Sequence, residues 1–185
     1  MKKLIIIFGL IACFSLPSFS NDSYFSVYDL STKNVNKIKY TLFGSITGSS
    51  EYFSEDLVDL KAAVVIHGGS YRYFLKDPYK SKFNGDSDLI SNIDEIKKIV
   101  KTLHETYNVK FYICGAGLKK HNISKNDIYD FIEVLPNSTI ALIELQNKGY
   151  AYIPIGDWFY FLSFLLSFLS YISLTKTKGL IWTQN

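Results

Sequence analysis

Two short stretches of the sequence combine a reactive side chain with glycines that leave space around it. His67 is followed by Gly68 and Gly69, and Cys114 is followed by the glycine-rich residues 115–117. A thiolate can attack or carry sulfur, and a protonated histidine or free backbone amides nearby favour the thiolate over the thiol. Glycine lets a substrate or a second backbone approach closely. The residue types therefore indicate thiol chemistry at Cys114, with His67 and the nearby amides favouring its charged form.

The same stretches also allow a structural interpretation, which the spacing alone leaves open. Free cysteine is among the most buried residue types and often packs like a small hydrophobic side chain. The Gly68-Gly69 pair lacks the glycine spacing and the lysine of a phosphate-binding loop. The candidate catalytic residues are Cys114 and His67, and the candidate binding residues are Gly68, Gly69, Tyr71, Gly115 and Gly117.

Metal sites, cofactor sites and nucleic-acid surfaces are poorly supported. His67, His104 and His121 stand at no metal-ligand spacing, either with one another or with Cys114. We therefore predict neither a metal nor another cofactor. The formal net charge of +3 comes from scattered lysines, with one arginine in the chain. Because no dense basic run lies on a predicted helix, we expect no nucleic-acid partner.

Two apolar runs are predicted strands that end at the candidate site. Residues 62–67 and 109–114 are rich in β-branched and aromatic side chains, as in strands that are buried on both faces. In open α/β sheets, ligands bind outside the carboxyl ends of the strands. If the two strands are neighbours, His67 and Cys114 approach one crevice. We then expect the Cys114 sulfur at the mouth of a cleft that solutes can reach.

Two further segments have helical patterns. In residues 91–107, apolar side chains recur at spacings of three and four residues with charged side chains between them, as in an amphipathic helix. Ser124 is a favourable N-cap, with Asp127 in the first turn, for a second helix. We expect that helix to continue to Leu135 and to end at Pro136.

The remaining patterns predict additional strands. Residues 37–42 alternate between polar and apolar side chains, residues 138–146 are apolar and strand-like, and residues 150–153 follow a turn at 147–149 as a closing strand. Strands separated by helical segments imply crossover connections and a mostly parallel sheet. The prediction is thus a three-layer α/β domain whose body covers about residues 36–154.

The first twenty residues have the pattern of a cleavable export signal. A short basic start precedes an apolar run, and small residues around Ser20 suit cleavage before Asn21. We therefore expect an exported protein, periplasmic or in the cell envelope. Cys13 offers a second interpretation, as the processed cysteine of a lipoprotein. If cleavage instead follows Ser20, Cys114 is the single thiol of the mature chain, which excludes an internal disulfide.

Residues 158–174 form an uncharged run of aromatic, aliphatic and serine side chains, followed by lysines. Its length is at the lower limit for a bilayer-spanning helix. A membrane anchor, a hydrophobic helix docked on the domain or in an oligomer, and an accidental extension of the reading frame all stay open. The predicted organisation is a signal peptide over 1–20, an α/β domain over 21–156, a hydrophobic helix over 157–175 and a polar tail over 176–185.

The order of these elements resembles the exported members of the DsrE/DsrF-like family. The resemblance covers about residues 36–154 and excludes the signal and the tail. The residues that carry it are the strand 63–68 with His67, the amphipathic helix, the strand 109–115 with Cys114, the segment from Ile123-Ser124 to Asp127-Ile128, and Gln146-Asn147-Lys148-Gly149-Tyr150-Ala151-Tyr152-Ile153.

The resemblance implies a doubly wound α/β domain that assembles into small homo-oligomers. It also implies a cysteine that carries a persulfide in the sulfur-relay members, and Cys114 matches that position. Two features depart from those members, which work in the cytoplasm with partner carriers and end soon after the closing strand. This chain has an export-like start and about thirty residues after that strand.

Two functional hypotheses follow, and they leave open whether the protein is an enzyme. In the first, the exported domain handles sulfur through Cys114 by persulfide or thiol exchange, with a sulfur-carrier protein or a small sulfur compound as its partner. In the alternative, it is a non-catalytic binding or oligomeric interaction module of the envelope without thiol chemistry. A purely structural envelope protein, in which the tail is the main functional element, is a third interpretation.

Overall fold

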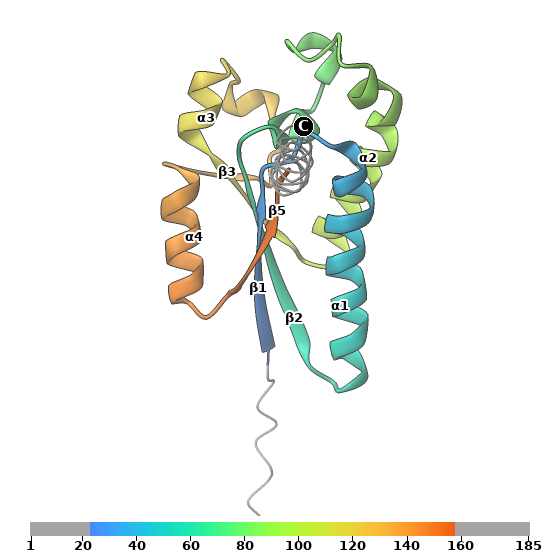
Figure 1. Cartoon of the computed structure of the whole chain (residues 1–185), viewed down its shortest axis with the longest axis vertical. Helices are drawn as coiled ribbons and strands as arrows, with labels where there is room; N and C mark the ends of the chain where they lie inside the picture. Colours follow the sequence, from blue (N-terminus) through green and yellow to red (C-terminus); the bar gives the residue numbers. More distant parts are fainter. Residues whose placement is uncertain (1–22, 158–185) are drawn as a thin grey trace, which may run out of the picture.

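A five-stranded parallel sheet forms the centre of the molecule. The computed structural model describes residues 23–157 (Figure 1). The strand order is β4-β3-β2-β1-β5, and every neighbouring pair is parallel. The strands are β1 (Ser23–Leu30), β2 (Asp59–Ile66), β3 (Lys110–Cys114), β4 (Glu133–Leu135) and β5 (Ala151–Ile155).

Helices cover both faces of this sheet, so the predicted three-layer α/β architecture is confirmed. Figure 1 shows α1 and α2 on one side of the strands and α3 and α4 on the other. The helices are α1 (Phe43–Glu55), α2 (Ser87–Glu105), α3 (Gly115–Lys120) and α4 (Ser138–Asn147).

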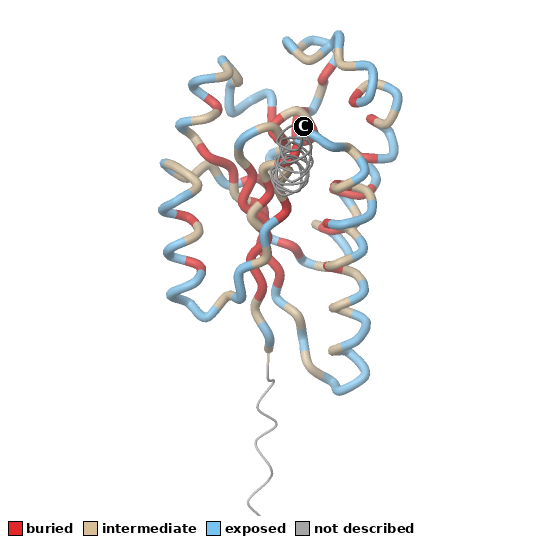
Figure 2. The backbone as a smooth tube through the Cα atoms, viewed as in Figure 1, coloured by how far each residue is buried: buried red, intermediate tan, exposed pale blue. Residues whose placement is uncertain are grey.

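The two faces of the sheet bury cores of very different size. Alternate residues of each strand point to opposite faces, so Val64 and Ile66 join the large core, which also takes side chains from α1 and α2. Ala63 and Val65 join a small core whose other members include Ala141 of α4. In Figure 2 the buried residues concentrate in the strands and on the sheet-facing sides of the helices. Small side chains let α4 lie close to the strands, near the edge where the candidate site is located.

The predicted amphipathic helix is confirmed, with shifted bounds. α2 begins at Ser87 because Asp86 accepts a hydrogen bond from the backbone N–H of Leu89 at 3.1 Å, as an N-cap does. The Asp86 carboxylate also pairs with the guanidinium of Arg72. The predicted start at residue 91 was late because Leu89, which lies four residues before Ile93 on the same buried face, was not included in the pattern.

The predicted strand over residues 37–42 is wrong. This segment is a π-helical turn, η1 (Lys37–Leu42), which continues into α1. Ile38, Leu42 and Ile46 are fully buried at a spacing of four residues, which places them on one helical face. Tyr40 would share a strand face with Ile38, but it is 68% exposed. The alternation was therefore a coincidence within a longer helical pattern.

The first strand, β1, lies before the predicted start of the domain body at residue 36. It pairs with β2 on one side and with β5 on the other. Its aromatic and aliphatic residues favour a strand, but the prediction for this region followed the polar residues around them. The wider range, 21–156, that we predict for the domain includes this strand.

Two more predictions near β4 are wrong. Ser124 does act as an N-cap, and it forms a reciprocal capping box with Asp127, but the helix is a single 3-10 turn, η4 (Lys125–Asp127). β4 lies where we expected the end of that helix. The predicted strand over residues 138–146 is α4, because Asn137 caps it by accepting from the N–H of Ile140 at 2.9 Å. This helix has exposed isoleucines, so its apolar residues show no clear helical period.

The turn and the closing strand at the end of the domain are confirmed. Gly149 has a φ of +88°, in the left-handed region that favours glycine, and β5 follows it. Pro154 lies within β5, which pairs only with β1 among the described strands. The missing N–H of proline therefore breaks no hydrogen bond to a second neighbouring strand. β5 is therefore an edge strand.

Neither terminal prediction falls on the described residues. The expected export signal and the hydrophobic segment 158–174 lie outside residues 23–157. Within that described part, no helix combines the length and the apolar character needed to cross a bilayer.

Candidate functional site

The carboxyl ends of β2 and β3 lie side by side, as the sequence predicts. Ile66 pairs with Ile113 at the end of the β2–β3 ladder. The next residues are His67 and Cys114, so both leave the sheet at its carboxyl edge. This is the edge at which open α/β sheets bind ligands.

Cys114 is both the last residue of β3 and the N-cap of α3. The polar groups that lower the pKa of its thiol are the backbone N–H of Gly117, the hydroxyl of Tyr71, and both the N–H and the hydroxyl of Ser138. These groups come from three separate segments, namely α3, the 3-10 helix η2 (Ser70–Phe74) and the first turn of α4. The sulfur therefore has a polar lining even though it lies inside the fold.

The environment of the Cys114 thiol acts on its pKa in two opposing directions. Burial raises the pKa, because it disfavours the charged thiolate, whereas the hydrogen bonds from Gly117, Tyr71 and Ser138 lower it. The lowering effect is larger, and the pKa of Cys114 lies below its ordinary value. A fold that only packed this residue as an apolar side chain would raise the pKa instead.

The expectation that the sulfur lies at an open cleft mouth is wrong. Cys114 is buried and only 7% exposed. The reason is local: α3 begins at the next residue, and the buried ring of Tyr71 packs against Gly117 of this helix. A reagent reaches the sulfur through a narrow exposed fraction or after local opening.

Tyr71 and the two glycines of α3 form one packed unit around Cys114. The Tyr71 hydroxyl lies 3.2 Å from the Cys114 carbonyl oxygen and donates to it. Burial and the neighbouring Cys114 raise the pKa of Tyr71 well above its usual range. A methyl group at Gly117 would overlap the Tyr71 phenol, and one at Gly115 would lie 2.9 Å from the Leu135 carbonyl oxygen. These predicted binding residues therefore surround Cys114 but make packing contacts.

This packing predicts a large cost for Gly117→Ala. Alanine favours helices over glycine, yet its methyl group would displace the Tyr71 ring. We expect a loss of about 1–3 kcal/mol in the free energy of unfolding, as for other overpacked sites. Urea unfolding would measure it. Gly48→Ala in α1 is the matched control, because no atom lies within 4 Å of the added methyl. The control should gain about 0.5–1 kcal/mol, and equal effects of the two substitutions would contradict the packing argument.

His67 faces β1 and β5 instead of Cys114. Its Nε2 lies 2.5 Å from Oδ1 of Asp29, and the other oxygen of that carboxylate accepts from the Tyr152 hydroxyl at 2.6 Å. Burial raises the pKa of Asp29, but the hydrogen bonds from His67 and Tyr152 and the charge of His67 outweigh it, so the pKa is lowered. An ionised carboxylate only accepts hydrogen bonds. The Nε2 atom of His67 therefore carries the hydrogen.

Tyr152 completes this second polar group. Its hydrogen bond to the ionised Asp29, together with partial burial, raises its pKa to about 12. The phenol therefore stays protonated at neutral pH and keeps donating to the carboxylate. The Asp29–His67–Tyr152 triad links the ends of β1, β2 and β5.

The glycines after His67 shape the backbone. Gly68 has a φ of +61°, and a Cβ there would lie 3.1 Å from the carbonyl oxygen of Ser31. The N–H of Gly69 donates to that same oxygen at 3.1 Å. The buried hydroxyl of Ser70 then donates to the carbonyl of Leu30 at 2.7 Å. Gly68 and Gly69 thus join the turn after β2 to the loop after β1.

The structure therefore divides the predicted site residues into two groups. Cys114, Tyr71, Gly115 and Gly117 lie together, whereas His67 belongs to the triad with Asp29 and Tyr152. Sequence reasoning missed Asp29, because β1 was not recognised, and it missed Ser138, because α4 was read as a strand. The N-cap residue Asn137, after Pro136, was the available signal for α4. Among residues 23–157, no cluster of three His, Cys, Asp or Glu side chains could hold a metal ion.

The model of the DsrE/DsrF-like family matches residues 32–155. A protein of Aquifex aeolicus (strain VF5), described as uncharacterized, is 44% identical over 62 residues, which cover 34% of this chain and 27% of that protein. The match thus spans about a quarter of that relative. The solved structure of MTH1491, a protein of unknown function from Methanobacterium thermoautotrophicum, aligns with a TM-score of 0.48 and 17% identity over 71% of this chain and 99% of that one.

Proposed function

Because the chain belongs to the DsrE/DsrF-like family, a family related to sulfur relay, we propose that it handles sulfur through Cys114, as a persulfide acceptor or a thiol-exchange site. One observation carries the proposal. Two backbone amides and two hydroxyls, which belong to Gly117, Tyr71 and Ser138, outweigh the effect of burial and lower the pKa of the Cys114 thiol. Donors aimed at a sulfur atom stabilise it as an anion, and the thiolate is the nucleophilic form.

The proposed uptake step is an exchange between two sulfur atoms. The Cys114 thiolate attacks the outer sulfur of a donor persulfide, and a bond forms between Sγ and that sulfur. The sulfur–sulfur bond of the donor breaks, and the donor leaves as a thiolate. The reaction consumes no external oxidant or reductant, because one persulfide is lost and one is formed. The donors around Cys114 favour the anion before the attack.

His67 contributes to this proposal indirectly. It follows β2 next to the end of β3, and a protonated imidazole near a thiol favours the thiolate. Its hydrogen-bond partner is Asp29, whose carboxylate offsets that charge. We therefore assign the thiolate stabilisation to Tyr71, Ser138 and the backbone amides, and to His67 the contact with Asp29 at the end of the neighbouring strand.

The burial of Cys114 favours a second candidate function. A residue that is 7% exposed suits a non-catalytic binding or oligomeric module in which the thiol is a packed side chain. The two candidates differ in whether the sulfur reacts in the native fold. A packed thiol stays unmodified until the protein unfolds, whereas a sulfur-handling thiol reacts without unfolding.

Mass spectrometry of the native full chain distinguishes these functions. After brief exposure to inorganic polysulfide, we expect Cys114 to gain the mass of one sulfur atom, and the addition to disappear after treatment with a reducing thiol. The Cys114→Ser variant is the control and should gain nothing at this position. If native Cys114 stays unmodified by polysulfide and by small alkylating reagents, the sulfur proposal fails and the binding module stands.

A further inference from the structure

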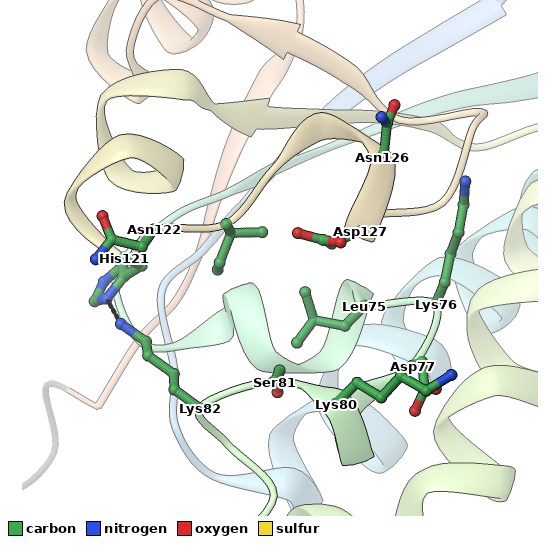
Figure 3. A pocket seen from close by; sticks show the side chains of 11 residues that line it. Leu75, Lys76, Asp77, Lys80, Ser81, Lys82, His121, Asn122, Asn126 and Asp127 are labelled. Atoms are coloured by element: carbon green, nitrogen blue, oxygen red, sulfur yellow. Dashed lines mark hydrogen bonds and ion pairs between the residues drawn. The ribbon is translucent and has the colours of Figure 1, made fainter.

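A pocket of about 410 Å³ lies beside the candidate site (Figure 3). One of its walls is the segment 75–82, which includes the 3-10 turn η3 (Pro78–Lys80), and the opposite wall is the segment 121–127 after α3. Lysines 76, 80 and 82 line it together with His121, Asp77 and Asp127. Figure 3 shows their side chains around a common space, which Leu75 of the first wall also lines.

Two of these lysines have carboxylate partners and one does not. The Lys76 amine lies 2.6 Å from Asp130, and the Lys80 amine lies 3.1 Å from Asp77. The Lys82 amine instead lies 2.8 Å from Nδ1 of His121, and no carboxylate of residues 23–157 forms an ion pair with it. Lys82 therefore brings to the pocket a positive charge that an outside anion can neutralise.

The carboxylates that line the pocket are already engaged. Asp77 pairs with Lys80 and accepts from the backbone N–H of Tyr79 at 3.1 Å. Asp127 accepts from the backbone N–H of Ser124 at 2.8 Å, within the capping box of η4. Among the described residues 23–157, neither carboxylate pairs with Lys82, so the pocket keeps a positive charge at Lys82, beside His121.

The contact between Lys82 and His121 defines the chemistry of this end. A lysine ammonium only donates, so Nδ1 of His121 accepts and the ring is neutral, with its hydrogen on Nε2. Burial lowers the pKa of His121, and the positive charges of Lys82, Lys120 and Arg72 lower it further. The imidazole thus lies among positive charges. The Lys82 ammonium and the Nε2–H of His121 are both donors, which suits a small anion.

Tyr71 contacts both a residue of the pocket, His121, and Cys114. The ring centroids of His121 and Tyr71 lie 5.2 Å apart, and the Tyr71 hydroxyl donates to the carbonyl oxygen of Cys114 at 3.2 Å. α3 also joins the two places directly, since Cys114 is its N-cap and His121 its C-cap. A ligand in the pocket would therefore lie next to the wall of the thiol site.

We propose that Lys82 and His121 bind the anionic group, an oxyanion such as a sulfonate or a carboxylate, of a small sulfur-bearing compound that approaches Cys114. The sulfur-bearing identity of the ligand rests on the proposed function, whereas anion binding at this pocket does not. The ammonium of Lys82 neutralises the anion, and the His121 ring, once protonated, donates to it. The ligand thus replaces the contact that Lys82 and His121 make with each other in the free protein.

The test measures anion binding in the full-length Cys114→Ser protein, in which sulfur exchange cannot occur. Inorganic sulfate is titrated against chloride at constant ionic strength while the ring signals of His121 are followed by NMR. We expect a saturable shift of those signals and a higher pKa of His121 in the sulfate complex, because a dianion stabilises the imidazolium. Lys82→Gln should weaken binding by about tenfold or more, as expected for the loss of a charged hydrogen bond.

Lys119→Gln is the matched control, because Lys119 lies in the same region but does not line the pocket. It should change the affinity by less than about twofold, as expected for a screened surface charge. Equal weakening by the two substitutions, or a shift that does not saturate, overturns the inference. If native Cys114 accepts sulfur while sulfate does not bind, the pocket inference fails alone. If sulfate binds and Cys114 never reacts, the proposed function fails and the anion site stands.

Discussion

Removal of both hydroxyl donors from Cys114, by Tyr71→Phe combined with Ser138→Ala, should slow its alkylation at neutral pH by about tenfold or more. Each hydroxyl lowers the pKa of the thiol, and a hydrogen bond to a charged group contributes about 1.5–3 kcal/mol. A thiol of higher pKa is also a stronger nucleophile once ionised, which offsets part of the loss. The rate with iodoacetamide, measured against pH, should therefore fall at neutral pH and recover in alkaline solution.

Tyr129→Phe is the control for this experiment. Among residues 23–157, its buried hydroxyl has no hydrogen-bond partner, and no interaction connects it to Cys114. Its removal should leave the alkylation profile unchanged. His67→Gln should have a smaller effect than the double variant, because the imidazole is paired with Asp29. A double variant whose pH profile matches that of the wild type would contradict the role of the hydroxyls. It would also contradict the lowered pKa of Cys114 on which the sulfur proposal rests.

Asp29→Asn should destabilise the fold by about 1–3 kcal/mol, because two donors lose an ionised acceptor in a largely buried place. Asp29 accepts from His67 at 2.5 Å and from Tyr152 at 2.6 Å. Asparagine keeps a single carbonyl oxygen and turns an amide donor toward one of these partners. Urea unfolding at neutral pH would measure the loss, since β1, β2 and β5 depend on this contact at their carboxyl ends.

The same carboxylate makes stability depend on pH. The pKa of Asp29 in the fold is below its ordinary value of 3.8, and Asp157, which accepts from Thr32 and Lys33, is shifted in the same direction. The unfolded chain therefore binds these protons more tightly. The stabilisation is fully present above the ordinary value and is lost as the pH falls through the lower folded values. Asp29→Asn should flatten this acid limb of the stability curve.

Asp56→Asn tests whether the effect is specific. Asp56 is an exposed residue at the end of α1, and its substitution should change the stability by less than about 0.5 kcal/mol. An Asp29→Asn protein with the stability and the acid sensitivity of this control would show that the contact with His67 and Tyr152 contributes nothing to folding. The triad would then make no contribution to the free energy of unfolding.

Local sequence patterns predicted the elements with strong apolar signals. Val64, Val65 and Ile66 identified β2, and the spacing of Ile93, Ile96 and Val100 identified α2, since a buried face leaves its period in the sequence. The pattern failed in α4, where burial is weak. The isoleucines at positions 140 and 143 of α4 are 40% and 54% exposed, so apolar residues lie on both the inner and the outer faces of this helix.

The candidate site was predicted only in part, because the residues around Cys114 and His67 come from distant segments. The position of Cys114 at a strand end next to glycines is a local property, and the sequence shows it. Its hydrogen-bond partners come from η2, α3 and α4, which are far apart in the chain, and their convergence depends on the packing of these segments. The pairing of His67 with Asp29 likewise depends on which strand lies next to β2.

The amino-acid sequence by itself determined that parallel strands would end at His67 and Cys114, because the buried runs and the glycines that terminate them are written in consecutive residues. The tertiary structure decided what these side chains meet. Strand order placed Asp29 beside His67, and the packing of α4 and Tyr71 enclosed Cys114 among hydrogen-bond donors. Partners of this kind are chosen by the joint burial of segments distant in sequence, and no local pattern encodes that choice.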